Sequence, residues 1–154
     1  MDSYVDEKIT DNNRNCVLKV TSKAGSILLT DDIEKEAVLA LLNCVTEQLE
    51  SDVLMVPHHG SKNSLSDGFI TAVAPNVSIF TTGYLNRFWH PKPLNIERYQ
   101  SFGSIMYRSN YDGALVIDYM NNLSNKNKIM FSSWRAQHQH YWQDTNVSEL
   151  GAME

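Results

Sequence analysis

The chain has 154 residues, of which 42% are hydrophobic and 20% charged, and its formal net charge is −5. This length suits one domain with a sizeable core, and the acidic balance gives no general attraction for nucleic acid or an anionic membrane. Contact with DNA would therefore need a local basic patch or a metal ion. No apolar run approaches the roughly 20 residues of a membrane helix, and the acidic start "MDSYVDEKIT" is unlike a signal peptide, so we expect no export or membrane signal.

The first third of the chain predicts a strand pair, a helix and a buried strand. "CVLKVT" (16–21) and "SILLT" (26–30) are typical of strands joined by the turn "SKAG". Residues 33–50 predict a helix because apolar side chains recur at every fourth position. The continuously apolar "DVLMV" (52–56) predicts a strand covered on both faces.

The middle of the chain continues the alternation of helices and strands. Residues 66–74 predict a short helix that a proline ends, and residues 77–82 predict a strand. Residues 83–93 hold two prolines and predict a loop. Residues 93–103 predict a helix with proline in its first turn and glycine just past its end.

The last third predicts strands over 105–109, 113–120 and 129–133 and a short amphipathic helix over 134–142. Alternating strands and helices indicate a layered α/β domain with flanking helices. The hairpin near the start and the strand pair near the end favour a mixed β-sheet. We expect this domain to span residues 13–143.

Both ends of the chain are polar. We therefore expect residues 1–12 and 144–154 to be frayed or disordered. The cysteines Cys16 and Cys44 sit among apolar residues and form no C-x-x-C pair, so we expect both to be buried and to form no disulfide.

Polar clusters follow three of the predicted strands, at the point where each strand ends. Strand ends are where α/β folds collect ligands, and a carboxylate with two imidazoles could converge there on one zinc or manganese ion. The cluster members are Asp31 and Asp32 after the second strand, His58, His59 and Ser61 after the third, and Asn86, Arg87 and His90 after the fourth.

Each cluster also has a purely structural explanation, which stays open at this point. Asp31, with Glu34 three residues later, resembles a capping box for the helix that follows. On extended backbone His58 and His59 would point oppositely, so one would bind a metal and the other would pack or contact substrate. His90 could be incidental surface beside a packed Trp89.

A second histidine pair, His138 and His140, lies near the C-terminus. On a helix this spacing puts the two rings on different faces, so we expect no metal binding there. Trp134, Tyr141 and Trp142 are interpreted as packing residues.

The segments "SILLTDDIE", "DVLMVPHHGSKNS", "VSIFTTGYLNRFWHPKP" and "YRSNYDGAL" together resemble the C-terminal metallo-β-lactamase-like domain of the ComEC/Rec family of competence proteins. The resemblance runs from about residue 12 to about residue 118, and "RAQHQHYW" is similar to the tail of γ-proteobacterial members. Members of this family are inner-membrane proteins that form the channel for DNA uptake in natural transformation. The resemblance implies a partial αββα sandwich on the periplasmic side of the inner membrane. It also implies a hydrolase that uses one or two divalent metal ions to degrade the non-transported single strand of DNA.

The resemblance also implies roles for individual residues. The metal ligands would be Asp32, His58, His59 and His90, with Asp32 and His59 as the catalytic pair and His59 nearer the metal. Substrate contacts would come from Ser61, Asn86 and Arg87.

Two departures from the family pattern bear on activity. Asp31 stands where the family has glycine, and the H-x-H-x-D-H motif that supplies most ligands of the metallo-β-lactamase fold is absent. We therefore expect the C-terminal half of the domain, from a truncated product, a split gene or an expression fragment. Alone, this half would bind metal weakly or not at all and have no robust nuclease activity.

Two other functions remain open. The chain could be a non-catalytic interaction domain that forms homo-oligomers through an exposed apolar sheet face. It could also be a complete but different phosphoesterase.

Overall fold

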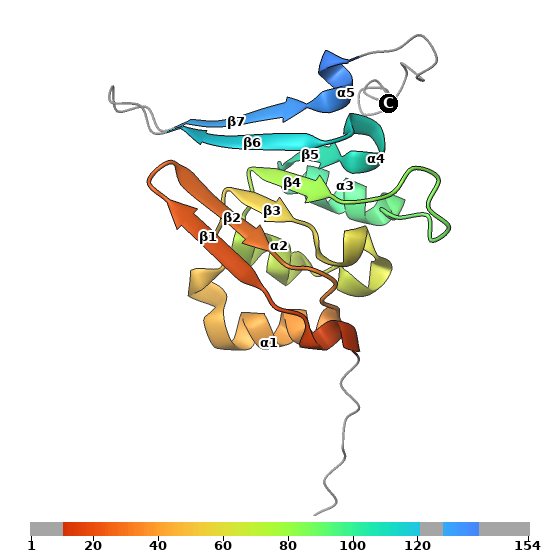
Figure 1. Cartoon of the computed structure of the whole chain (residues 1–154). Helices are drawn as coiled ribbons and strands as arrows, with labels where there is room; N and C mark the ends of the chain where they lie inside the picture. The colour runs from red at the N-terminus through yellow and green to blue at the C-terminus, as the bar shows by residue number, and fades with distance from the viewer. Residues whose placement is uncertain (1–10, 121–127, 139–154) are drawn as a thin grey trace, which may run out of the picture.

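The computed structural model describes residues 11–120 and 128–138. Helices and strands alternate through most of this range, as the sequence predicts (Figure 1). In chain order the elements are η1 (Asp11–Arg14), β1 (Leu18–Ser22), β2 (Gly25–Leu29), α1 (Lys35–Val45), η2 (Thr46–Gln48), β3 (Val53–Met55), η3 (Pro57–Gly60), η4 (Lys62–Ser64), α2 (Asp67–Val73), β4 (Val77–Phe80), α3 (Pro93–Ser101), β5 (Ile105–Arg108), α4 (Ser109–Asp112), β6 (Leu115–Met120), β7 (Lys128–Ser133) and α5 (Trp134–Gln137).

The main sheet has five strands in the order β1-β2-β3-β4-β5. β1 pairs with β2 antiparallel, and each later neighbouring pair is parallel. The expected mixed sheet with flanking helices is therefore confirmed. Because β2, β3, β4 and β5 run the same way, the loops that follow them all leave from one edge of the sheet.

β6 and β7 form a separate two-stranded antiparallel sheet. The sequence correctly predicts strands at both positions. The expectation that the strand pair near the end helps to make the main sheet mixed is wrong. The short helix α4 turns the chain out of the main sheet after β5, and the antiparallel β1 alone makes that sheet mixed.

The main sheet lies between a helical layer and the β6-β7 hairpin (Figure 1). Side chains alternate along each strand, so neighbours on β3 face opposite layers. Leu54 packs with Val38 of α1 and Phe69 of α2, whereas Val53 packs beneath Ile117 of β6. This alternation explains why the short strand β3 is apolar throughout.

The hairpin covers only the middle of its face of the sheet. Val20 on β1 pairs with Ile27, which packs beneath the hairpin, yet Val20 itself is 48% exposed. Leu18 on β1 and Ile105 on β5 are also exposed. The outer side of the hairpin shows apolar side chains too, namely Val116, Met120 and Met130.

The start of α1 differs from the prediction. The helix begins at Lys35, and its N-cap residue Glu34 makes no capping hydrogen bond with its side chain. Asn13 in η1 caps it instead, because its Oδ1 accepts hydrogen bonds from the backbone N–H of Glu34 at 3.0 Å and of Ala37 at 3.4 Å. The capping box proposed for Asp31 and Glu34 is therefore wrong.

The expected burial of the cysteines is also wrong, since Cys16 and Cys44 are both exposed. Cys16 precedes the uncovered edge strand β1. Cys44 lies on α1 outside the apolar stripe of this helix. That stripe, formed by Val38, Leu41 and Val45, packs on the core. Both thiols are free.

The C-terminal helix α5 begins at Trp134 as predicted, and residues 139–142 of the expected helix lie outside the described residues. No helix in the described part of the chain is long and apolar enough to cross a membrane. The proposed domain limits stay a prediction, although residues 11 and 12 belong to η1.

Candidate functional site

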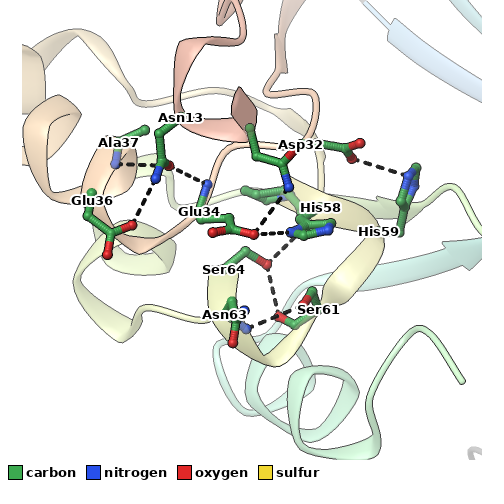
Figure 2. A network of polar contacts seen from close by, with 12 residues as sticks. Asn13, Asp32, Glu34, Glu36, Ala37, His58, His59, Ser61, Asn63 and Ser64 are labelled. Carbon is green, nitrogen blue, oxygen red and sulfur yellow. Dashed lines mark hydrogen bonds and ion pairs between the residues drawn. The ribbon is translucent and has the colours of Figure 1, made fainter. Parts of the chain in front are cut away.

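The predicted residues Asp32 and His59 meet at the carboxyl edge of the sheet. Asp32 lies in the loop after β2, and its Oδ1 is 3.2 Å from Nε2 of His59 in the loop after β3 (Figure 2). On the other side of the ring, Nδ1 of His59 is 3.1 Å from Oγ1 of Thr81, just past β4. Three consecutive parallel strands thus fix one imidazole, and both of its nitrogens have polar partners.

His58 points away from this pair toward Glu34. Its Nδ1 lies 3.3 Å from Oε1 of Glu34, an ion-pair distance if the ring is protonated, and Nδ2 of Asn12 donates to the same oxygen at 3.2 Å. The rings of His58 and His59 are 6.4 Å apart with an angle of 67° between their planes. The prediction that the two histidines have different partners agrees with this geometry.

The prediction from the sequence attributes the opposite directions of His58 and His59 to extended backbone. That reason is wrong, because the backbone at these two residues is not extended. His58 and His59 have φ values of 47° and 56°, in the left-handed region that non-glycine residues rarely adopt. Asp31, which replaces the family's glycine, has a φ of 51° and lies in the same region. Its carbonyl accepts a hydrogen bond from the N–H of His58 at 3.0 Å and so ties the two loops together.

His90 completes the cluster from the loop after β4. Its ring centroid is 6.1 Å from that of His58, and its other face stacks on Phe88 at 5.8 Å. Its Nδ1 is buried and has no hydrogen-bond partner in the structure. Burial lowers the pKa of His90, and the charges of Lys92, His58 and His59 lower it further, whereas Asp32 acts in the opposite direction.

Asn86 holds His90 in place. Its Nδ2 donates to the carbonyl of His90 at 2.7 Å, and its Oδ1 accepts from the N–H of His90 at 2.9 Å. The same Nδ2 also donates to the carbonyl of Gly83 at 3.2 Å. Asn86 is therefore a positioning residue in this structure, and its predicted contact with substrate stays a prediction.

Gly60 joins the two histidine-bearing loops. Its φ is 76°, and a Cβ atom at this position would lie 2.7 Å from the Phe80 ring and 2.8 Å from Cβ of Pro91. Its carbonyl accepts a hydrogen bond from the N–H of Lys92 at 3.1 Å. Gly60 therefore provides both a turn of the backbone and a close approach of the two loops.

Ser61 and Arg87, the other predicted substrate contacts, differ in exposure. Ser61 is buried, and its hydroxyl accepts from the N–H of Asn63 at 3.4 Å, which caps η4. Arg87 is exposed, with its guanidinium carbon 4.6 Å from the centre of the Phe88 ring. A substrate role for either stays a prediction, and Arg87 is the one that faces solvent.

The donor types in this cluster suit a divalent cation, because imidazole nitrogens and a carboxylate are ligands of zinc and manganese. The unpartnered buried Nδ1 of His90 is one nitrogen that such an ion could satisfy. Within residues 11–120 and 128–138, however, no three His, Cys, Asp or Glu side chains are arranged to hold a metal ion. The chain thus brings suitable donors together as pairs, without three of them directed at one point.

Three of the contributing residues were not predicted from the sequence. Thr81 lies in the "TTGY" segment at a strand end, a position that could have suggested it. Asn12 and Asn13 act across more than 20 residues of chain, so no local signal reveals them.

The second histidine pair is described only in part. His138 stacks on Trp134 with ring centroids 3.7 Å apart, and His140 lies outside the described residues. Trp134 is exposed, so its interpretation as a packing residue is wrong, whereas Tyr141 and Trp142 lie outside the described residues. A shallow hollow between Ser26, Asp52 and Asn76 lies at the opposite edge of the sheet, where the parallel strands begin.

Fold and cluster together define an α/β protein with histidines and a carboxylate gathered at the carboxyl edge of a mostly parallel sheet. The chain is 33% identical to competence protein ComA of Neisseria gonorrhoeae over 109 residues, which is 71% of this chain and 16% of that protein. It is 33% identical to ComE operon protein 3 of Bacillus subtilis over 112 residues (73% of this chain and 14% of that protein). It is 29% identical to recombination protein 2 of Haemophilus influenzae over 128 residues (82% of this chain and 16% of that protein).

The chain belongs to the ComEC/Rec family of competence proteins, as its sequence motifs indicated. It spans between 14% and 16% of the length of these relatives. No protein-family model matches the chain. No solved structure matches it either.

Proposed function

We propose that this chain is the C-terminal part of a metallo-β-lactamase-like hydrolase domain that acts in DNA uptake. In the complete domain, the reaction would be hydrolysis of the phosphodiester backbone of the non-transported DNA strand. The observation that supports this best is the contact of Asp32 with His59, together with His90 beside His58, at three successive strand ends. The names of the relatives, which refer to competence and recombination, support the link to DNA uptake.

The residues that would hold a zinc or manganese ion are Asp32, His58, His59 and His90. Such an ion would supply the Lewis acidity that lowers the pKa of a water molecule and stabilises charge on phosphate. Asp32 and His59 are the residues to which we assign catalysis, with Thr81 and Asn86 as positioning residues. Thr81 fixes the His59 ring, and Asn86 fixes the backbone of His90.

The same geometry supports the proposal that the chain alone is inactive. Tight binding of a catalytic metal needs three well-placed protein ligands and partners that orient them, and the described residues provide suitable donors only as pairs. We expect weak binding of manganese and zinc in calorimetric titrations. We also expect no steady cleavage of single-stranded DNA. Robust cleavage by the purified chain, abolished by a chelator and by His59→Ala, would contradict this.

The rest of the site would come from a preceding half of the domain, the partner that the family resemblance implies. In a full-length protein this assembly would lie on the periplasmic side of the inner membrane beside the DNA channel. Adding a separately expressed N-terminal half from a relative should raise metal affinity in the same titration. An unchanged affinity despite complex formation would count against a shared site.

A second candidate function is a non-catalytic interaction domain, and one observation favours it. The apolar face of the main sheet continues beyond the hairpin to Leu18 and Val20, which are 55% and 48% exposed. Such an uncovered strip suits a second copy of the chain or the missing half. Light scattering separates the two functions: metal-binding monomers favour the hydrolase part, and dimers that bind no metal favour the interaction domain.

A further inference from the structure

The loop after β4 exposes an unusual amount of aromatic surface. We name residues 83–92 the aromatic loop. Within it the side chains of Tyr84, Leu85, Phe88 and Trp89 are 63%, 81%, 56% and 79% exposed. The alternative in which Trp89 packs beside His90 is therefore wrong. Its indole is directed to solvent although burial would be favourable by roughly 2 kcal/mol or more.

Hydrogen bonds and the backbone conformation of the aromatic loop hold these side chains on the surface. The N–H of Trp89 donates to the carbonyl of Asn86 at 3.1 Å, and Nζ of Lys92 donates to the carbonyl of Phe88 at 2.8 Å. Leu85 and Trp89 have φ values of 49° and 56°, which bulky residues adopt rarely and at an energetic cost. The loop therefore presents its side chains in a fixed arrangement, and a partner would bind without ordering it first.

The aromatic loop is locally basic although the whole chain carries a formal charge of −5. Arg87 and Lys92 belong to the loop. Lys62 lies two residues after Gly60, whose carbonyl binds the N–H of Lys92. A polyanion would thus meet the two cationic side chains Arg87 and Lys92 at this loop, which holds no acidic residue.

The aromatic loop also leads into the candidate site. The guanidinium of Arg87 lies over the ring of Phe88, and Phe88 in turn stacks on His90 with 16° between the ring planes. One cation and two flat rings, those of Arg87, Phe88 and His90, therefore follow one another from the loop to the histidine cluster. This arrangement matches a strand of nucleotides, in which phosphates and flat bases alternate.

We propose that the aromatic loop is a stacking platform for the bases of a single-stranded nucleic acid, with Trp89 and Tyr84 as the base-contacting residues and Arg87 and Lys92 facing phosphate. Stacking on aromatic side chains tolerates any base sequence, as a non-specific strand-degrading domain would require. The inference rests on the proposed function, since it assigns the strand a path toward Asp32 and His59. Insertion into a lipid surface is the competing use of the same side chains.

Fluorescence anisotropy with a fluorescein-labelled oligothymidylate of about 12 nucleotides, in a chelating buffer, tests this inference. We expect Trp89→Ala to weaken binding about tenfold and Trp89→Phe to weaken it less, because phenylalanine keeps a ring for stacking. Trp134→Ala, at another exposed tryptophan, should leave the affinity unchanged. An oligomer of the same length without bases should bind more weakly and be insensitive to Trp89→Ala.

Any of three outcomes would contradict the proposed stacking platform. The first is that Trp89→Ala and the parent chain bind the oligonucleotide equally well. The others are that the oligomer without bases binds as tightly as the oligothymidylate, or that the chain binds no oligonucleotide. Binding through Trp89 to vesicles of phosphatidylethanolamine and phosphatidylglycerol, without oligonucleotide binding, would assign the loop to a membrane instead. Circular dichroism of each variant confirms that the fold is retained.

The chelator separates this inference from the proposed function. Oligonucleotide binding that depends on Trp89, with no metal binding at Asp32 and His59 even after the N-terminal half is added, would support the platform and remove the hydrolase assignment. Metal binding at that pair without Trp89-dependent oligonucleotide binding would remove the platform alone.

Discussion

Gly60 is the residue on which the geometry of the two histidine loops depends most. It combines a left-handed φ of 76° with a close approach to Phe80 and Pro91 that leaves no room for a Cβ atom. We predict that Gly60→Ala lowers the free energy of unfolding by about 2–4 kcal/mol, from backbone strain and overpacking together. Urea denaturation measures this change.

Gly103 provides a matched control for Gly60. Its φ of 83° is similar, but nothing lies within 4 Å of the position that a Cβ atom would take. Gly103→Ala should therefore cost only the backbone strain, about 1 kcal/mol. Equal losses in the two variants would mean that the contact of Gly60 with Phe80 and Pro91 has no energetic weight.

The buried phenol of Tyr99 should make the stability of the protein depend on pH. Its ring is 2% exposed and lies edge-on to Phe80 at 5.6 Å. Burial raises the pKa of the Tyr99 phenol well above its usual value. The folded state therefore favours the neutral phenol. Its contribution to stability is fully present below the unfolded pKa of about 10 and is lost as the pH rises above it.

We predict that Tyr99→Phe weakens the alkaline decline in stability, which urea denaturation at a series of alkaline pH values measures. Tyr119 retains a smaller decline of its own, because burial and the charge of Asp52 raise its pKa. Tyr84→Phe, at a residue that is 63% exposed, is the control and should leave the decline unchanged. The assignment fails if the two variants have the same effect.

At the scale of the element, the start of α1 depends on a side chain from another element. Asn13 in η1 accepts hydrogen bonds from two N–H groups at the start of this helix, and its Nδ2 donates to Oε2 of Glu36 at 2.9 Å. We predict that Asn13→Ala lowers the free energy of unfolding by about 1 kcal/mol. Asn43→Ala, at an exposed position within α1, should be neutral or slightly stabilising because alanine is the better helix former.

Asn13→Ala should also change the titration of Glu36. A backbone hydrogen bond and the bond from Asn13 lower the pKa of Glu36, so removing Asn13 should move that pKa back toward its usual value. Carboxyl chemical shifts recorded against pH report this directly. An unchanged pKa would show that the bond from Asn13 is not formed in solution.

The elements themselves could be predicted from the sequence because their signals are local. Apolar runs located β2, β3 and β4, and Pro93 correctly placed the start of α3. The assignment of β6 and β7 to a second sheet could not be predicted, since strand pairing depends on contacts distant in the chain. The cap from Asn13 was missed for the same reason.

The sequence indicated which polar side chains lie at the strand ends, and it was less informative about their geometry. Strand-end positions predicted that Asp32 and His59 lie close together, as they do, and His90 lies beside His58. The left-handed backbone at His58 and His59 is set by contacts with other loops, which the local sequence does not encode. The exposure of Trp89 also could not be foreseen, because an aromatic side chain in a loop ordinarily suggests packing.

At the scale of the whole molecule, the layers are unequal. The helical layer covers one face of the sheet, and the β6-β7 hairpin lies on the other (Figure 1). On the hairpin side Leu18 and Val20 are exposed. An apolar strip of this kind promotes association.

We predict that Leu18→Thr combined with Val20→Thr reduces self-association, measured as the concentration dependence of the mass from light scattering. Threonine keeps the strand preference of β1 while replacing apolar surface by hydroxyl groups. Leu39→Gln, which removes a 46% exposed leucine from α1, is the control and should leave association unchanged. Equal association of the double variant and the parent chain would show that this face is not the interface.

The proposed function requires that Asp32, the His58–His59 pair and His90 contribute to one site for a divalent cation. Paramagnetic broadening by added manganese tests it most directly, because it detects weak binding and locates the ion by residue. We predict broadening centred on the backbone and imidazole signals of these residues, reduced in His59→Ala, while His138 stays sharp. Broadening centred elsewhere, or spread evenly over the acidic surface, would show that these residues do not share a cation site.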